Sequence, residues 1–223
     1  MNMMSKEEAR RELVEIGKKI AEKGLVVGPG GNTSVRVGNL VYMKASGISF
    51  ETAKEEDYIG VDINTGDVVD GNLKPTSEIW LHLECYRIRD DINAVVHTHP
   101  PLSIAYAFQG DPLRPFTPDM VALLGSDIPI IEYVVPGGKE FANSVKEIIK
   151  NHNGVLIKNH GLVTVGNNLR EAYYRTLLIE DSIKTVIFAK LLGSMRFFTE
   201  QQIEEINNLE IERYRRKFLK EHY

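Results

Sequence analysis

The chain has 223 residues, a formal net charge of −4, 43% hydrophobic residues and 26% charged residues, a composition typical of soluble globular proteins. This balance gives no electrostatic reason to expect nucleic acid or a membrane surface as a partner. The single cysteine excludes an intrachain disulfide, and no apolar run reaches the roughly 18 residues that span a bilayer. The first residues lack the basic and apolar regions of a signal peptide, so we expect a cytoplasmic protein.

The first part of the chain is predicted to form one helix followed by hairpins. Ser5 and Glu8 form a capping box, and apolar residues then recur at helical spacing as far as Ile20. A glycine-rich loop separates this helix from segments with strand character, and Gly38-Asn39 is a typical two-residue hairpin turn. The predicted strands cover residues 34–37, 40–44, 58–62 and 68–69.

The remainder of the chain alternates between helix and strand patterns. Thr76 or Ser77 is expected to cap one helix, and Asn168 with Glu171 caps a long one. The predicted helices cover residues 76–89, 102–108, 139–150, 168–192 and 199–220, and the predicted strands 93–99, 128–135 and 155–165, the last of them interrupted at His160-Gly161.

Helices therefore bracket a sheet that is built partly from hairpins. This arrangement predicts an α/β fold with a mixed, largely antiparallel sheet. No linker-like segment, repeat or low-complexity tract divides the sequence, so we predict a single domain over residues 1–223.

Two histidines separated by one residue close a hydrophobic strand. Because side chains alternate between the two faces of a strand, His97 and His99 are expected on the same face. A second strand-like run ends at His160. A single histidine is more often a satisfied polar group, but three at two strand ends are typical of a catalytic metal with an open coordination position. The chain is therefore predicted to be a metalloenzyme.

Other segments are candidates for anion binding. Thr76 and Ser77 are adjacent hydroxyl residues at a predicted helix start. Glu78 follows them, either as a carboxylate favoured by the helix dipole or as an acid/base or metal ligand. The loop 30–33 lacks the Gly-x-Gly-x-x-Gly dinucleotide fingerprint. This loop and the turn 45–47 are either phosphate nests made of backbone amides or plain tight turns.

Five motifs in this order resemble the class II aldolase/adducin head family. They are Gly-Gly-Asn-Thr-Ser-Val-Arg, Ser-Gly-Ile, Pro-Thr-Ser-Glu, Val-Val-His-Thr-His and Lys-Asn-His-Gly-Leu. The similarity runs roughly from Ala9 to Leu192. It implies a single three-layer α/β/α domain around a central, largely antiparallel sheet, assembled as a homotetramer with active sites between neighbouring subunits.

The resemblance also implies the roles of individual residues. One Zn²⁺ per subunit would be held by His97, His99 and His160. Glu78 would be the catalytic acid/base and a possible fourth ligand of the zinc. The substrate's phosphate would be bound by Gly31, Asn32, Ser46, Gly47, Thr76 and Ser77.

The reaction implied is the reversible cleavage of a phosphorylated ketose, similar to L-fuculose 1-phosphate, into dihydroxyacetone phosphate and an aldehyde. Glutamate at position 78 favours an aldolase or a dehydratase acting on methylthioribulose 1-phosphate. Asp119 instead resembles an aspartate that L-ribulose-5-phosphate 4-epimerase uses as a proton donor from the adjacent subunit. Tyr214 resembles a tail tyrosine placed over the neighbouring site, although a surface tyrosine is equally compatible. The epimerase and dehydratase stay open as alternatives.

Overall fold

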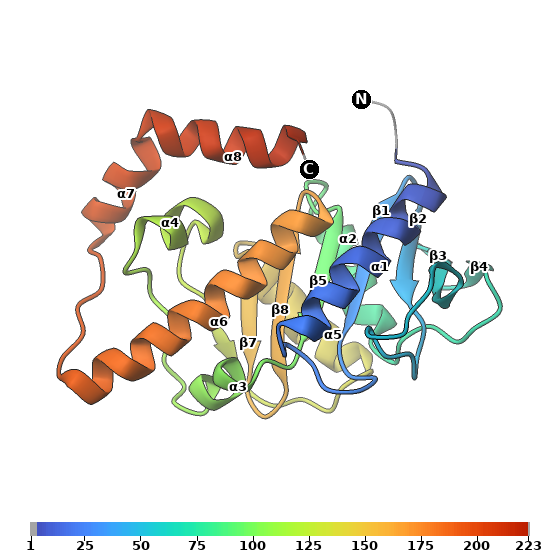
Figure 1. The fold of residues 1–223 in the computed structure, drawn as a ribbon, viewed down its shortest axis with the longest axis horizontal. Helices are drawn as coiled ribbons and strands as arrows, with labels where there is room; N and C mark the ends of the chain where they lie inside the picture. The colour runs from blue at the N-terminus through green and yellow to red at the C-terminus, as the bar shows by residue number, and fades with distance from the viewer. Residues whose placement is uncertain (1–3, 223) are drawn as a thin grey trace.

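The computed structural model describes residues 4–222, so residues 1–3 and 223 of the predicted domain lie outside the described residues. A central sheet is covered by helices on both faces (Figure 1). The described residues form eight strands and eight α-helices. This arrangement confirms the predicted three-layer α/β fold.

The strands lie in the order β4-β3-β2-β1-β5-β8-β7-β6. Neighbouring strands are antiparallel except β6 and β7, which are parallel, so the sheet is largely antiparallel, as predicted. The strands are β1 (Asn32–Val37), β2 (Leu40–Lys44), β3 (Tyr58–Asp62), β4 (Val68–Asp70), β5 (Ala94–Thr98), β6 (Ile130–Ile131), β7 (Gly154–Ile157) and β8 (Gly161–Gly166).

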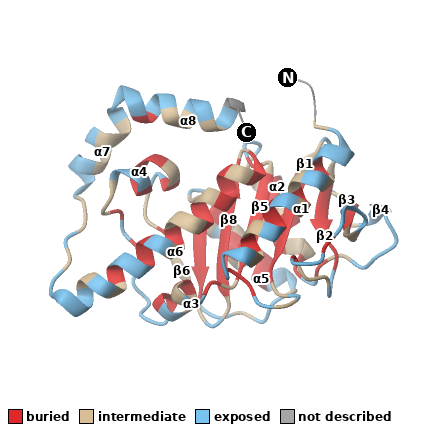
Figure 2. Cartoon of the chain, in the orientation of Figure 1, coloured by how far each residue is buried: buried red, intermediate tan, exposed pale blue. Residues whose placement is uncertain are grey.

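The helices form the two outer layers. Helices α1 and α6 share a buried apolar cluster with one face of the sheet, and α2 and α5 share another with the opposite face. Most of the strands are buried between them, although β4 at the edge of the sheet is largely exposed, and α7 and α8 are largely exposed as well (Figure 2). The helices are α1 (Lys6–Glu22), α2 (Ile79–Ile88), α3 (Pro101–Ala107), α4 (Pro118–Leu124), α5 (Lys139–Ile149), α6 (Leu169–Leu192), α7 (Glu200–Asn208) and α8 (Glu210–His222), with a short 3₁₀ helix at Glu55–Asp57.

Local sequence signals account for the ends of the main helices. Ser5 and Glu8 make both hydrogen bonds of the predicted capping box at the start of α1. The side chain of Asn168 accepts a hydrogen bond from the backbone N–H of Glu171 at the start of α6. These caps satisfy N–H groups that the first helical turn leaves unpaired. Between residues 4 and 222, no helix has the length and apolar character needed to cross a membrane.

Two predicted helices have different bounds in the structure. Helix α2 begins at Ile79, with Glu78 in the position before the first helical residue and without a side-chain cap. The hydroxyl of Thr76 instead accepts the N–H of Glu78 two residues on, which is a local turn and not a helix cap. The last predicted helix is two helices, because Leu209 has an extended backbone (φ −62°, ψ 132°) that separates α7 from α8.

The segment between α3 and α5 also differs from the prediction. The predicted strand 128–135 is reduced to the two residues of β6. On its N-terminal side Pro129 has no N–H to donate to a neighbouring strand, and Ile128 pairs with Leu113 instead. Helix α4 was not predicted. Thr117 caps it by accepting the N–H of Met120, and Pro118 occupies its first turn, where a proline fits without loss of a hydrogen bond.

Gly161, at the start of β8, is required for the approach of β8 to β5. A Cβ atom at this position would lie 2.2 Å from the backbone oxygen of Thr98. We therefore expect Gly161→Ala to lower the free energy of unfolding by about 1–3 kcal/mol, measured by urea denaturation. Gly138→Ala is the control, because a Cβ there meets no atom within 4 Å. Equal midpoints for Gly161→Ala and the unmodified protein would contradict this account.

Candidate active site

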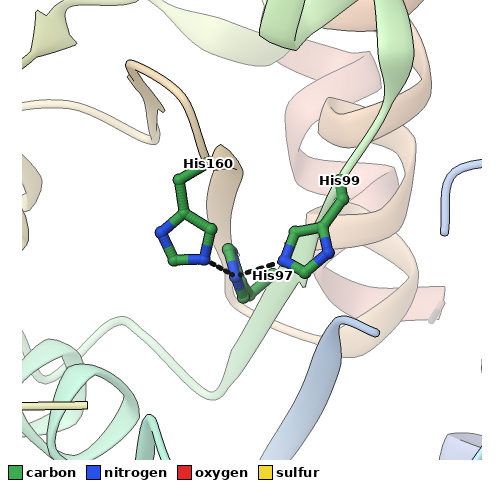
Figure 3. Close-up of side chains that lie close together, drawn as sticks. All are labelled: His97, His99 and His160. Carbon is green, nitrogen blue, oxygen red and sulfur yellow. Dashed lines mark hydrogen bonds between the residues drawn. The ribbon is translucent and has the colours of Figure 1, made fainter. Parts of the chain in front are cut away.

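Three histidine side chains from two strand ends converge in the structure (Figure 3). His97 lies in β5, His99 directly after it, and His160 in the turn between β7 and β8. The Nε2 atom of His97 lies 3.1 Å from Nε2 of His99 and 3.2 Å from Nε2 of His160. Alternation along β5 thus places His97 and His99 on one face, and the pairing of β5 with β8 brings His160 beside them.

The protonation of these histidines suits metal binding. The Nδ1 atom of His97 lies 3.1 Å from the carbonyl oxygen of Leu162, so Nδ1 carries the proton and Nε2 keeps its lone pair. Burial lowers the pKa of His97 to about 4 and also lowers the pKa of His99. Both rings are therefore neutral at pH 7, which is the form that binds a metal ion. The three residues can hold a metal ion.

Glu78 reaches the histidines from the start of α2. Its Oε1 atom lies 3.2 Å from Nε2 of His160, and its Oε2 atom lies 3.2 Å from Nε2 of His97. Asn32 donates a hydrogen bond of 2.8 Å to Oε2. Among the described residues, Oε1 is buried without a hydrogen-bond partner. An unpaired buried oxygen beside a member of the histidine cluster fits a site for a cation or for a proton in transfer.

Opposing effects act on the carboxyl group of Glu78. Burial favours the neutral acid and would raise the pKa of Glu78. The charge that His97 carries when it is protonated, the neighbouring ring of His160 and the hydrogen bond from Asn32 outweigh burial, so this pKa lies well below its ordinary value. Glu78 is therefore an ionised carboxylate at pH 7.

A pocket opens beside the histidines and Glu78. The residues predicted for phosphate binding all border it. Gly31 has a backbone φ of +65°, and a Cβ there would lie 2.8 Å from the carbonyl oxygen of His97, so a glycine is required. The pocket is lined by Pro29, Gly30, Gly31, Asn32, Lys44, Ala45, Ser46, Gly47, Thr76, Ser77, Glu78, His99, Pro136 and His160.

Two residues with predicted roles lie outside this pocket. Asp119 in α4 forms an ion pair of 2.5 Å with Arg215 of α8, and Tyr214 is 61% exposed on α8. Helix α8 lies near the end of the sheet where α6 begins, whereas the turn that carries His160 lies at the opposite end (Figure 1). Asp119 and Tyr214 therefore do not reach the histidines of their own chain.

Lys44 belongs to the pocket and was missed by sequence reasoning. It is only 2% exposed, and its Nζ donates hydrogen bonds to the carbonyl oxygens of Pro29, at 3.0 Å, and Ile48. It thus connects the two loops that border the pocket. Burial lowers the pKa of Lys44 to about 8. The available signal was a charged residue at the end of an apolar strand, directly before Ala45-Ser46-Gly47.

The chain matches the family described as Class II Aldolase and Adducin N-terminal domain over residues 11–187. An L-fuculose phosphate aldolase from Methanococcus maripaludis is 37% identical over 76% of this chain and 91% of that protein. A 5-deoxy-D-ribulose 1-phosphate aldolase from Bacillus thuringiensis serovar kurstaki is 34% identical over 88% of this chain and 92% of that protein.

Relatives with a different reaction are also similar. A 3-oxo-tetronate 4-phosphate decarboxylase from Haemophilus influenzae is 30% identical over 90% of this chain and 97% of that protein. Among solved structures, an L-fuculose 1-phosphate aldolase superposes with a TM-score of 0.85 at 34% identity, covering 92% of this chain and 96% of that one. Fold and sequence similarity therefore both extend over most of the chain.

We expect the three histidines to bind one divalent metal ion per chain. His99→Ala removes one of three nitrogen ligands, so it should lower metal content to a small fraction of one equivalent after dialysis, measured by elemental analysis. His152→Ala is the matched control, because His152 lies outside the cluster. Full metal occupancy in His99→Ala would falsify this assignment of the ligands.

Proposed function

Because the chain belongs to the class II aldolase and adducin N-terminal domain family, we propose that it is a zinc-dependent aldolase. Its proposed substrate is a phosphorylated ketose similar to L-fuculose 1-phosphate, which it would cleave reversibly into dihydroxyacetone phosphate and an aldehyde. The observation that carries the proposal is the position of Glu78, whose carboxylate lies 3.2 Å from two of the three clustered histidines, beside a pocket lined with glycine and hydroxyl residues. The two aldolase relatives support this reaction class.

The proposed metal ligands are His97, His99 and His160, with Glu78 as a possible fourth. A Zn²⁺ ion there would supply the Lewis acid that the ketose carbonyl needs when the neighbouring carbon–carbon bond breaks. The hydrogen bond from His97 to Leu162 holds the ring of His97 in a ligating orientation. Three histidine ligands leave a coordination position open, as in catalytic zinc sites.

Glu78 is the proposed acid/base. In cleavage, the ionised carboxylate of Glu78 would take up the proton that the hydroxyl group beside the breaking bond releases as it becomes the aldehyde. Glu78 would then deliver this proton to the carbon that becomes the hydroxymethyl group of dihydroxyacetone phosphate. In synthesis, the ionised carboxylate removes that proton. The depressed pKa of Glu78 keeps it ionised at pH 7, so it is ready to act as the base.

The proposed phosphate site is the neighbouring pocket. The hydroxyl side chains of Ser46, Thr76 and Ser77 border it with the amide of Asn32, together with loops that contain Gly31 and Gly47. Hydroxyl and amide donors of this kind bind phosphate without an arginine. The buried ammonium group of Lys44 adds positive charge at the same place. Binding there would fix the unreactive end of the substrate relative to Glu78.

We further propose a homotetramer with active sites between neighbouring subunits, in which Asp119 and Tyr214 act on the site of an adjacent subunit. Their exclusion from the pocket of their own chain supports this arrangement. Light scattering should then give the mass of four chains at micromolar concentration. A monomer under these conditions would eliminate both residues as donors across an interface.

The decarboxylase relative supports a second candidate. Loss of carbon dioxide from a 3-oxo acid and cleavage of a ketose both leave negative charge on a carbon beside a carbonyl group, so the same pocket suits both reactions. The test is a panel of phosphorylated ketoses and 3-oxo sugar acids with three readouts. Release of triose phosphate supports the aldolase, release of carbon dioxide the decarboxylase, and an isomerised pentose phosphate without release the epimerase alternative. Loss of water from methylthioribulose 1-phosphate would indicate the dehydratase.

Lys44 makes phosphate binding dependent on pH in this proposal. Lys44 is charged below its pKa of about 8 and neutral above it, so the affinity for inorganic phosphate should fall as the pH rises from 7.5 to 9. Lys44→Met should bind phosphate roughly tenfold more weakly at pH 7.5, equivalent to about 1.4 kcal/mol, and should show no further fall up to pH 9. Calorimetric titration of the metal-loaded protein measures both effects. An unchanged pH dependence in Lys44→Met would show that another group is responsible.

Glu78→Gln tests the acid/base directly. Glutamine retains the size of the side chain but cannot exchange a proton as a carboxylate does. Turnover should fall by about two to four orders of magnitude, with phosphate affinity retained. Exchange of the hydroxymethyl proton of dihydroxyacetone phosphate with solvent should also be lost, and this half-reaction needs no aldehyde. Proton exchange at the unmodified rate would make Asp119 the leading candidate for the base.

A further inference from the structure

His82 lies in α2, one helical turn after Glu78, and its side chain is completely buried. Both ring nitrogens have partners on β1. Nδ1 lies 2.6 Å from the hydroxyl oxygen of Ser34, and Nε2 lies 2.5 Å from Oδ1 of Asn32. His82 does not line the pocket, and its hydrogen bond with Asn32 connects it to the site.

The direction of each hydrogen bond follows from the carboxylate of Glu78. An ionised carboxylate only accepts hydrogen bonds, so Nδ2 of Asn32 donates to Glu78 and Oδ1 of Asn32 faces His82. The Nε2 atom of His82 must then carry the proton. Burial lowers the pKa of His82 to about 3, so the ring carries a single proton at pH 7 and Nδ1 is an acceptor.

The hydrogen bonds on the Ser34 side of His82 have a defined direction as well. Since Nδ1 of His82 accepts, the hydroxyl of Ser34 donates to it. The oxygen of Ser34 then accepts from the hydroxyl of Tyr86, which lies 2.7 Å away. Ser34 and Tyr86 are both buried. The protons therefore point in one direction from Tyr86 to Glu78, through five side chains on β1, α2 and the residue that precedes α2.

We infer that His82 is a positioning residue, which fixes the side-chain amide of Asn32 in the orientation that donates to Glu78. In the reversed orientation, Oδ1 of Asn32 would face the carboxylate and its Nδ2 would face the N–H of His82, so two acceptors and two donors would oppose each other. The inference rests on the proposed role of Glu78 as the acid/base.

The same amide links Glu78 to the substrate pocket. The nitrogen of Asn32 carries a second hydrogen, and Asn32 borders the proposed phosphate site. His82 would therefore orient one donor for the catalytic carboxylate and one for the anchored end of the substrate. Proton transfer at a fixed carbon atom requires that the catalytic carboxylate and the anchored substrate be aligned with each other.

The kinetic test compares His82→Leu with His82→Gln. Leucine cannot donate to Asn32, whereas the glutamine amide can. We expect His82→Leu to keep its metal and to lower kcat about 10- to 100-fold, the effect typical of residues that orient catalytic groups, with KM changed less than about threefold. His82→Gln should recover most of the loss. A kcat within twofold of the unmodified enzyme in His82→Leu would overturn the inference, and so would equal losses in both variants.

A pair of matched variants distinguishes the effect of the hydrogen-bond series on kcat from the effect of removing any buried tyrosine hydroxyl. Tyr86→Phe removes the first donor of the series and should lower kcat several-fold. Tyr58→Phe also removes a buried tyrosine hydroxyl, which donates to the carbonyl oxygen of Leu13 away from the site, and should leave kcat unchanged. Equal kcat values for the two phenylalanine variants would mean that the hydroxyl of Tyr86 plays no part.

A measurement without substrate distinguishes failure of this inference from failure of the proposed function. In protein labelled with ¹⁵N-histidine, NMR should show His82 as the Nε2–H tautomer without titration between pH 5.5 and 8, with the signal assigned by its absence from His82→Gln. The Nδ1–H tautomer would overturn the inference. The expected tautomer in a protein inactive on every phosphorylated ketose would leave the hydrogen-bond order intact and remove the proposed function.

Discussion

The site depends on the pairing of three neighbouring strands, β1, β5 and β8, at the ends where they approach one another. Asn32 at the start of β1 lies opposite His97 in β5, and β8 begins opposite the end of β5. Gly161 permits this last approach, because any side chain there would meet the backbone of Thr98. A shift of one residue in either pairing would turn a functional side chain to the opposite face of the sheet. Packing of the core against both faces of the sheet therefore fixes the strand register, and this register brings the site residues together at one end of the sheet.

The face of the sheet that packs against α2 combines an apolar core with a continuous polar series. Apolar residues such as Val95 and Leu83 are completely buried there, and so are the polar side chains of Ser34 and His82. Burial of polar groups is costly unless each one finds a partner. Here each member donates to the next, and the series ends on a carboxylate, the strongest acceptor available. Such a series of paired polar groups favours a single arrangement of its members.

Much of the fold and part of the site could be predicted from local sequence patterns. The capping box at Ser5 and the alternation that places His97 beside His99 are properties of adjacent residues. The partners of Lys44 and His82 were not predictable in this way, because they depend on which loops and strands the fold brings together. The break at Leu209 lies within a helical pattern that is continuous in sequence, and it was also missed. Sequence patterns therefore predicted best those site residues whose relative positions depend on the periodicity of a single helix or strand.

The division of the site between elements bears on substrate choice under the proposed function. The pocket and Glu78 are built from the ends of strands and the start of α2, and they would hold the phosphate and move the proton, steps that every phosphorylated ketose shares. Asp119 and Tyr214, the groups proposed to meet the variable aldehyde end, do not line this pocket. Asp119 is instead paired with Arg215, so α4 and α8 are held together as a separate part of the surface. If neighbouring subunits present this surface to the pocket, α4 and α8 can vary in sequence without disturbing the strand pairing that the histidines require. The strand ends and Glu78 would then determine the reaction chemistry, and α4 and α8 would determine selectivity for the aldehyde end of the substrate.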